Sequence, residues 1–181
     1  VRSLCHILSK AVNDILPSAT MNLEHSVSKG YYCMIHNGKN LDQVTIDKIK
    51  VRMQEIIDAD LPFHHTSVRT EEAVALFRGR GLEDKAKLIE SAGMAYTSYF
   101  ELEGYINFFY GCLTPSSGYI HLFYIVSYYE GILLRIPQRC NPMELEPVIP
   151  QDKMFEVFKE HLTLLSTLEL DNVGDLNHAI S

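Results

Sequence analysis

Apolar residues recur at helical spacing in several parts of the chain. Leu4, Ile7, Leu8, Val12 and Leu16 predict an amphipathic helix that ends before Pro17. The same periodicity runs from residue 41 to residue 59, where Thr45 is the predicted N-cap because its side-chain oxygen can accept from free backbone N–H groups. Further helices are predicted from residue 70, at 82–91 and at 151–168.

Segments rich in β-branched and aromatic residues lie between these helices. They predict strands at 31–35, 62–68, 96–101, 104–109, 119–127 and 131–136. Turn signals separate them at Gly30, at Asn37-Gly38, and near residues 103–104, 114–118 and 130–131. The pattern predicts an α+β fold, an antiparallel sheet with flanking helices.

The last quarter of the chain, from residue 137, changes in composition. Residues 137–150 contain Pro137, Pro142, Pro147 and Pro150, which predicts a loop or extended connector. The tail after Leu170 is rich in Asp and Asn, and we interpret it as an exit linker. We expect a core at 1–136, a connector with a closing helix at 137–170, and the linker at 171–181. Because a helix is already under way at residue 1, we expect a fragment of a longer protein.

Charge and cysteine content narrow the class of protein. The 181 residues carry a net charge of −7, which disfavours non-specific binding to nucleic acid. Two basic groups remain candidates for a local patch, although solvated helix faces are the simpler interpretation. They are Lys48, Lys50 and Arg52, and Arg69, Arg78 and Arg80. Cys5, Cys33, Cys112 and Cys140 form no CxxC pair, which is typical of free thiols. With neither a signal peptide nor a long apolar run, we expect a cytoplasmic protein without a membrane partner.

Few motifs carry chemistry. The cluster Arg78-Gly79-Arg80-Gly81 lacks the GxxxxGK(S/T) spacing of a phosphate loop and follows no predicted strand. Cys33 and His36 have the CxxH spacing of a metal site, but residues three apart on a strand point to opposite faces and cannot share a metal ion. The adjacent His64 and His65 also point to opposite faces of a strand, so they are poor partners for one metal ion. The tyrosines could stack nucleic-acid bases, although packing within the sheet is the simpler interpretation; they are Tyr96, Tyr99, Tyr105, Tyr110, Tyr119, Tyr124, Tyr128 and Tyr129.

The order of several short segments resembles a known domain. A helix with His6-Ile7-Leu8 leads to Leu16-Pro17, then to Gly30-Tyr31-Tyr32, and a long helix follows. Leu61-Pro62, Glu71-Glu72-Ala73, Gly104-Tyr105-Ile106-Asn107 and Gly111 come later in the same order. Over residues 1–136 this resembles the second additional domain of threonyl- and alanyl-tRNA synthetases, the editing domain of the threonyl enzyme. The resemblance implies an editing-domain-like fold.

Two motifs of that family line a site that binds zinc in the alanyl branch and hydrolyses mischarged tRNA in the threonyl branch. Carried over, the His-x-x-x-His motif falls on Arg2 and His6, and the Cys-x-x-x-His motif falls on Phe109 and Leu113. An Asp of the preceding strand falls on Asn107. The resemblance therefore implies a vestigial pocket at these five positions, without metal, in which only His6 and Asn107 are weak catalytic candidates.

Loss of these motifs suggests a particular parent protein. The degenerate motifs, the Gly30-Tyr31-Tyr32 segment, the prolines after residue 136 and the closing helix resemble bacterial uridine kinase-like proteins that carry a ubiquitin-like TGS domain. The resemblance implies kinase and TGS domains as neighbours, and ATP and Mg²⁺ bound only by a kinase domain outside this chain. The expected role is recognition, regulation or scaffolding, with a nucleotide or tRNA as candidate ligand. A tRNA-editing hydrolase with a rebuilt, metal-free site and an RNA-binding module stay as alternatives.

Overall fold

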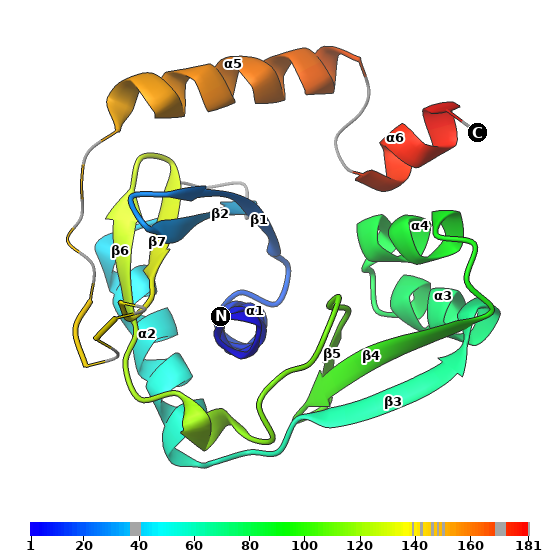
Figure 1. Cartoon of the computed structure of the whole chain (residues 1–181), viewed down its shortest axis with the longest axis horizontal. Helices are drawn as coiled ribbons and strands as arrows, with labels where there is room; N and C mark the ends of the chain where they lie inside the picture. Colours follow the sequence, from blue (N-terminus) through cyan, green and yellow to red (C-terminus); the bar gives the residue numbers. More distant parts are fainter. Residues whose placement is uncertain are drawn as a thin grey trace. The chain divides into compact units, whose positions relative to one another are not determined.

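The computed structural model describes residues 1–36, 41–138, 140–141, 143–145, 147, 149, 151–168 and 173–180. It has the predicted α+β fold with antiparallel sheets flanked by helices, and the chain divides into two compact units (Figure 1). Unit 1 comprises Val1–Phe63 and Gly111–Pro150, and unit 2 comprises His64–Tyr110 and Gln151–Ser181. The predicted Asn37-Gly38 turn, Pro142 and Pro150 lie outside the described residues.

Unit 1 is built on a four-stranded antiparallel sheet in the order β1-β2-β7-β6. The strands are β1 (Thr20–Val27), β2 (Gly30–His36), β6 (Tyr124–Tyr128) and β7 (Gly131–Arg135). Helix α1 (Arg2–Ile15) packs against helix α2 (Gln43–Asp58), and α2 also packs against the edge strand β6 (Figure 1). Ser28 and Lys29 form the β1–β2 turn at positive φ, so that Gly30 opens β2 and is not itself in the turn.

The interior of unit 1 is filled by alternating strand residues and the inner stripes of two helices. Ile7 and Leu8 of α1, Ile49 of α2, and Ile132 and Leu134 of β7 are all fully buried. Burying an aliphatic side chain of this size contributes about 1.5–3 kcal/mol. Helix α1 is unusual because every residue from Ser3 to Val12 is buried, polar ones included. The amphipathic helix that the sequence predicts is therefore enclosed over most of its length.

Unit 2 holds a smaller sheet in the order β3-β4-β5, with strands β3 (His64–Arg69), β4 (Tyr96–Leu102) and β5 (Tyr105–Asn107). Helices α3 (Thr70–Gly79) and α4 (Glu83–Ser91) pack together around Phe77 and Ile89. The unit also contains α5 (Asp152–Thr167) and α6 (Val173–Ile180), and α6 packs on α4.

Two local predictions were wrong. The N-cap of α2 is Asp42, whose carboxylate accepts from the backbone N–H of Thr45 at 2.9 Å, so Thr45 lies inside the first turn. The strand predicted at 119–127 begins only at Tyr124, because residues 117–119 form a 3₁₀ turn, η1 (Ser117–Tyr119), tied to the end of α2. Helix α6 lies within the tail that we interpret as an exit linker, and the assignment of that tail as a linker stays a prediction.

None of the helices in the described part of the chain has the length and apolar content that crossing a bilayer requires.

Candidate functional site

His6 is enclosed in the core of unit 1. The side chain is completely buried, and its ring meets the ring of Phe63 edge-on with centroids 5.5 Å apart. It lies on α1 between Cys5 and Ile7, which are also buried. A general base must lie within hydrogen-bond reach of the water that it activates. The position of His6 therefore suits a packed core histidine better than a base that faces solvent.

Arg2 opens the same helix but is exposed. Its guanidinium lies against the backbone at Gly111, where an added Cβ would come within 3.1 Å of the Arg2 Cζ atom. Gly111 has φ +99°, a conformation that side chains other than glycine rarely adopt. The absence of a side chain at Gly111 therefore leaves room for the Arg2 guanidinium. Arg2 also places a positive charge at the start of α1.

The N-terminal turn of α1 is tied to the segment that follows Gly111. The Ser3 hydroxyl oxygen accepts from the backbone N–H of Thr114 at 2.9 Å and lies 3.0 Å from the Thr114 hydroxyl. Leu113, half-buried, directly precedes Thr114. The structure therefore brings Arg2 and Leu113 to one region of unit 1 although they are far apart in sequence. Sequence reasoning missed Ser3, Thr114 and this tie, because no local pattern signals a contact over such a separation.

Asn107 and Phe109, the other two predicted pocket positions, belong to unit 2. Asn107 ends β5 and is almost fully buried, and its side-chain oxygen accepts from the backbone N–H of Phe108 at 2.9 Å. Phe109 is half-buried. The vestigial pocket of five residues stays a prediction. Arg2, His6 and Leu113 are described within one unit, and Asn107 and Phe109 within the other.

Cys5 and Cys33 are two buried free thiols in unit 1. Burial raises the pKa of Cys5 to about 11, although the positive N-terminus opposes the shift. Burial, together with the charges of Cys5 and Glu24, also raises the pKa of Cys33 well above its usual value. The thiolate is the form that attacks substrates or binds metals. At neutral pH both groups therefore stay protonated and behave as small apolar side chains.

The histidine motifs that the sequence offered do not gather into a ligand set. Cys33 and His36 lie on β2, with Cys33 buried and His36 exposed, as strand alternation predicts. His64 and His65 are neighbours on β3, and the ring of His65 packs 4.9 Å from Phe100. Among the described residues, no group of three or more His, Cys, Asp or Glu side chains could hold a metal ion.

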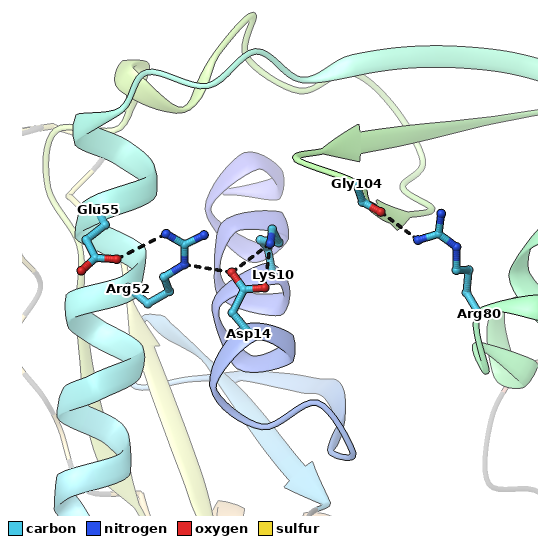
Figure 2. A network of polar contacts seen from close by, with 6 residues as sticks. All are labelled: Lys10, Asp14, Arg52, Glu55, Arg80 and Gly104. Carbon is cyan, nitrogen blue, oxygen red and sulfur yellow. Dashed lines mark hydrogen bonds and ion pairs between the residues drawn. The ribbon is translucent and has the colours of Figure 1, made fainter.

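The Arg78-Gly79-Arg80-Gly81 cluster lies at the end of α3, after a helix and not after a strand. Arg78 forms ion pairs with Glu83 at 3.2 Å and Glu90 at 2.8 Å. Arg80 donates to the backbone oxygen of Gly104 at 2.9 Å (Figure 2). These arginines already serve contacts inside unit 2, which favours a structural role over a phosphate loop.

Helices α1 and α2 of unit 1 share a chain of charges (Figure 2). Asp14 accepts from Lys10 at 2.6 Å and from Arg52 at 2.8 Å, and Arg52 also reaches Glu55 at 3.3 Å. Burial alone would raise the pKa of Asp14, but the hydrogen bonds and charges of Lys10 and Arg52 outweigh it and hold that pKa below its usual value. Beside this network a shallow hollow of about 410 Å³ is lined by Ile15, Val44, Asp47, Lys48, Val51, Arg52 and Glu55.

The tyrosines divide into packed and exposed rings. Tyr128 is buried, and Tyr99 meets Phe77 edge-on with centroids 6.1 Å apart, as sheet packing predicts. Tyr124 differs because cations flank its ring: the Lys50 Nζ lies 4.1 Å from the ring centroid, and the Arg135 Cζ lies 5.8 Å from it. Four further rings are largely exposed: Tyr96, Tyr110, Tyr119 and Tyr129.

Comparison with known proteins identifies similar chains. No family model matches this chain. It is 26% identical to the threonine–tRNA ligase of Geobacter sp. (strain M21) over 125 residues, which is 69% of this chain and 20% of that protein. It is 33% identical to the threonine–tRNA ligase of Hahella chejuensis (strain KCTC 2396) over 122 residues, 67% of this chain and 19% of that protein. The threonine–tRNA ligase of Methylobacillus flagellatus is 27% identical over 134 residues, 71% of this chain and 21% of that protein.

The chain thus spans about a fifth of the length of the relatives that it matches. These similarities support the predicted resemblance to threonyl-tRNA synthetase, and the α+β fold agrees with an editing-domain-like architecture.

Proposed function

We propose that this chain is a non-catalytic recognition domain of the threonyl-tRNA synthetase editing type. The observation that carries the proposal is the environment of His6, which keeps the residue type of its motif position but is fully buried against Phe63. An imidazole enclosed in this way has no exposed surface on which to meet a bulky substrate.

The other motif positions support the same proposal by their chemistry. Phe109 and Leu113 have no lone pairs to offer a metal ion, and Arg2 places a positive charge near the position of a cation. The buried thiols of Cys5 and Cys33 are held in their protonated form. The tie between Ser3 and Thr114 links the two segments that carry Arg2 and Leu113. On this proposal the scaffold is kept while its chemistry has been replaced.

Zinc content and deacylation of mischarged tRNA test the proposal together. The purified chain is assayed for bound zinc and for hydrolysis of seryl- and alanyl-tRNA, with a His6→Gln variant as the matched control. We expect zinc far below one ion per chain and turnover equal to that of buffer. One zinc ion bound per chain would contradict the proposal. So would deacylation that disappears in a folded His6→Gln protein, because that result is the one expected of a rebuilt hydrolase using His6 and Asn107.

We further propose that the domain belongs to a cytoplasmic nucleoside kinase-like protein. The support is the resemblance in the Gly30-Tyr31-Tyr32 segment, in the prolines that begin at Pro137 and in the closing helix α5. On this proposal ATP and Mg²⁺ bind to a kinase domain outside the chain, and kinase and TGS domains are its neighbours. The open reading frame tests this: a GxxxxGK(S/T) motif within a few tens of residues after Ser181 is expected, and an aminoacylation domain there would contradict it.

A further inference from the structure

The outward face of α2 carries two exposed valines. Val44 and Val51 are 59% and 58% exposed, and a separation of seven residues places them on nearly the same line along the helix. Beside them lies the hollow of about 410 Å³, whose lining also includes Ile15 at the end of α1. Valine is a poor helix former, so helix propensity does not account for the two exposed valines. We call Ile15, Val44 and Val51 the valine strip.

Two opposite charges flank the valine strip. Successive residues of a helix are turned by about 100°, so Asp47 and Lys48 lie on opposite sides of the line that joins the two valines. Both residues are exposed, and Asp47 accepts from the uncharged Gln43 side chain at 3.0 Å. Hydrogen bonds with Thr45 lower the pKa of Asp42 most, and the charge of Lys48 contributes least. Over the described residues, neither Asp47 nor Lys48 forms an ion pair.

The charges toward the other end of α2 are already paired. Arg52 forms ion pairs with Asp14 at 2.8 Å and with Glu55 at 3.3 Å (Figure 2). The Arg52–Asp14 pair joins α2 to α1, so it stabilises the fold of unit 1 itself. The charges on this face that an external partner would complement are therefore those of Asp47 and Lys48.

A second copy of the chain supplies the complementary surface. When two α2 helices lie side by side in the same direction, a two-fold axis parallel to them brings opposite sides of the two helices together. Each valine then meets its own equivalent, and Asp47 of each copy faces Lys48 of the other. Antiparallel helices would instead place Lys48 opposite Lys48 and Asp47 opposite Asp47, which is repulsive. The charges therefore favour the parallel arrangement.

We propose that the valine strip, Asp47 and Lys48 form the interface of a homodimer in which the two α2 helices are parallel. Burial of the apolar strip supplies affinity, and the two symmetry-related ion pairs fix the register of the helices. Interfaces of standard size bury about 800 Å² per partner, and one helix face is smaller, so we expect a dissociation constant of about 10–100 µM. The dimer does not depend on the proposed recognition function.

Sedimentation velocity of the intact chain at about 5 to 500 µM tests self-association. We expect dimers that form with rising concentration, and a dissociation constant at least about 10-fold higher for Val44→Ser/Val51→Ser. The matched control is Val157→Ser/Leu164→Ser in α5, because these residues are also seven apart and are 63% and 56% exposed. The control should change the constant less than about 2-fold. A monomeric wild type, or an equal or larger loss in the control, would overturn the proposal.

Charge exchange tests the register of the two helices. Asp47→Lys and Lys48→Asp each place like charges opposite one another, so each alone should weaken the dimer about 5-fold or more. Asp47→Lys/Lys48→Asp restores both ion pairs with their signs exchanged and should return the dissociation constant to within about 2-fold of the wild type. A double variant that dimerises no better than either single variant would overturn the parallel pairing. Melting curves of all variants exclude misfolding as the cause of a loss.

Disulfide trapping reports the direction of the helices. The background variant Cys112→Ser/Cys140→Ser removes the two exposed thiols. In this background Val51→Cys should form covalent dimers under mild oxidation, because position 51 of one copy meets position 51 of the other. Leu164→Cys, the control in α5, should stay monomeric. Covalent dimers that form only in a mixture of the Val44→Cys and Val51→Cys proteins would indicate antiparallel helices and overturn the proposal.

Discussion

A buried hydroxyl in unit 1 and an exposed arginine in unit 2 make different kinds of polar contact. In unit 1 the fully enclosed Ser117 hydroxyl donates to the Ile56 oxygen at 2.6 Å and accepts from the Leu61 N–H at 2.8 Å. In unit 2 the ion pairs of Arg78 lie at the surface, with side chains 45–56% exposed. Buried polar groups are costly when they lose a partner, whereas exposed ion pairs contribute little. Substitutions of the same kind should therefore have unequal effects in the two units.

The comparison also bears on the predicted pocket. His6 and the Ser3–Thr114 tie both belong to unit 1, where the His6 side chain is fully buried. The exposure of a histidine decides whether its ring can reach a substrate, and the sequence alone does not give that exposure. The difference between the units teaches that the identity of a motif residue says less about function than its exposure does.

The largest expected effect is that of Gly131→Ala in unit 1. An added Cβ would lie 2.4 Å from the backbone oxygen of Cys33, an atom that cannot move aside without breaking the sheet. We expect a loss of about 3 kcal/mol or more in the free energy of unfolding, measured by urea denaturation. The matched variant in unit 2 is Gly79→Ala, where nothing lies within 4 Å and the helix should gain up to about 1 kcal/mol. Similar changes in the free energy of unfolding for Gly131→Ala and Gly79→Ala would contradict the contrast between the two units.

Ser117→Ala should have the next largest effect. It leaves the Ile56 oxygen and the Leu61 N–H without their buried partner, which costs about 2–3 kcal/mol. The control is Ser91→Ala in unit 2, where the half-buried hydroxyl donates to the Leu88 oxygen and accepts from the Asn177 side chain, and about 1 kcal/mol or less is expected. If thermal unfolding gives Ser91→Ala the larger loss, the two units do not differ as described.

Asp14→Asn probes the charge network of α1 and α2. Since the pKa of Asp14 is lowered in the folded chain, its ionised form stabilises the fold above the ordinary carboxyl pKa, and this stability is lost as pH falls through the lowered value. The variant should lose about 1–2 kcal/mol at pH 7 and show a weaker dependence of stability on pH below about 4. Glu90→Gln, which removes an exposed partner of Arg78, should leave both quantities unchanged. If the stability of Asp14→Asn depends on pH below about 4 as strongly as that of the wild type, the role of the network is contradicted.

Much of the fold followed from local patterns, and most of the contacts did not. Helical periodicity located α1, α2 and α5, and β-branched and aromatic composition between turn signals located β2, β4 and β7, because these signals are confined to short windows. The cap at Asp42 was missed by three residues, since Thr45 offers a similar oxygen and only the backbone geometry decides between them.

The late start of β6 and the burial of His6 depend on contacts between distant segments. The Ser117–Ile56 bond joins residues 61 positions apart in sequence. The rings of Phe63 and His6 likewise meet although the two residues are far apart in sequence. The cation–ring contacts of Tyr124 have the same origin. Lys50 was a candidate in a basic patch, but its neighbour Arg52 turned out to be neutralised, and only the pairing of β6 with β7 brings in Arg135. The periodicity of apolar residues along the sequence does not predict such long-range contacts.

The smallest effect is expected at α6, the helix within the predicted linker. Asp175 accepts from Lys87 of α4 at 2.7 Å, with side chains 18% and 37% exposed, respectively. Asp175→Asn should change the free energy of global unfolding by less than about 0.5 kcal/mol, because a pair at this exposure is screened by solvent. Amide hydrogen exchange in residues 173–180 should nevertheless rise several-fold, since local opening needs only the contact with α4 to break. Asn177→Ala, which removes the bond to Ser91, should act in the same direction. Unchanged exchange in both variants would mean that α6 is held to unit 2 by its apolar packing alone, and the contrast between the units would then be one of buried polar groups only.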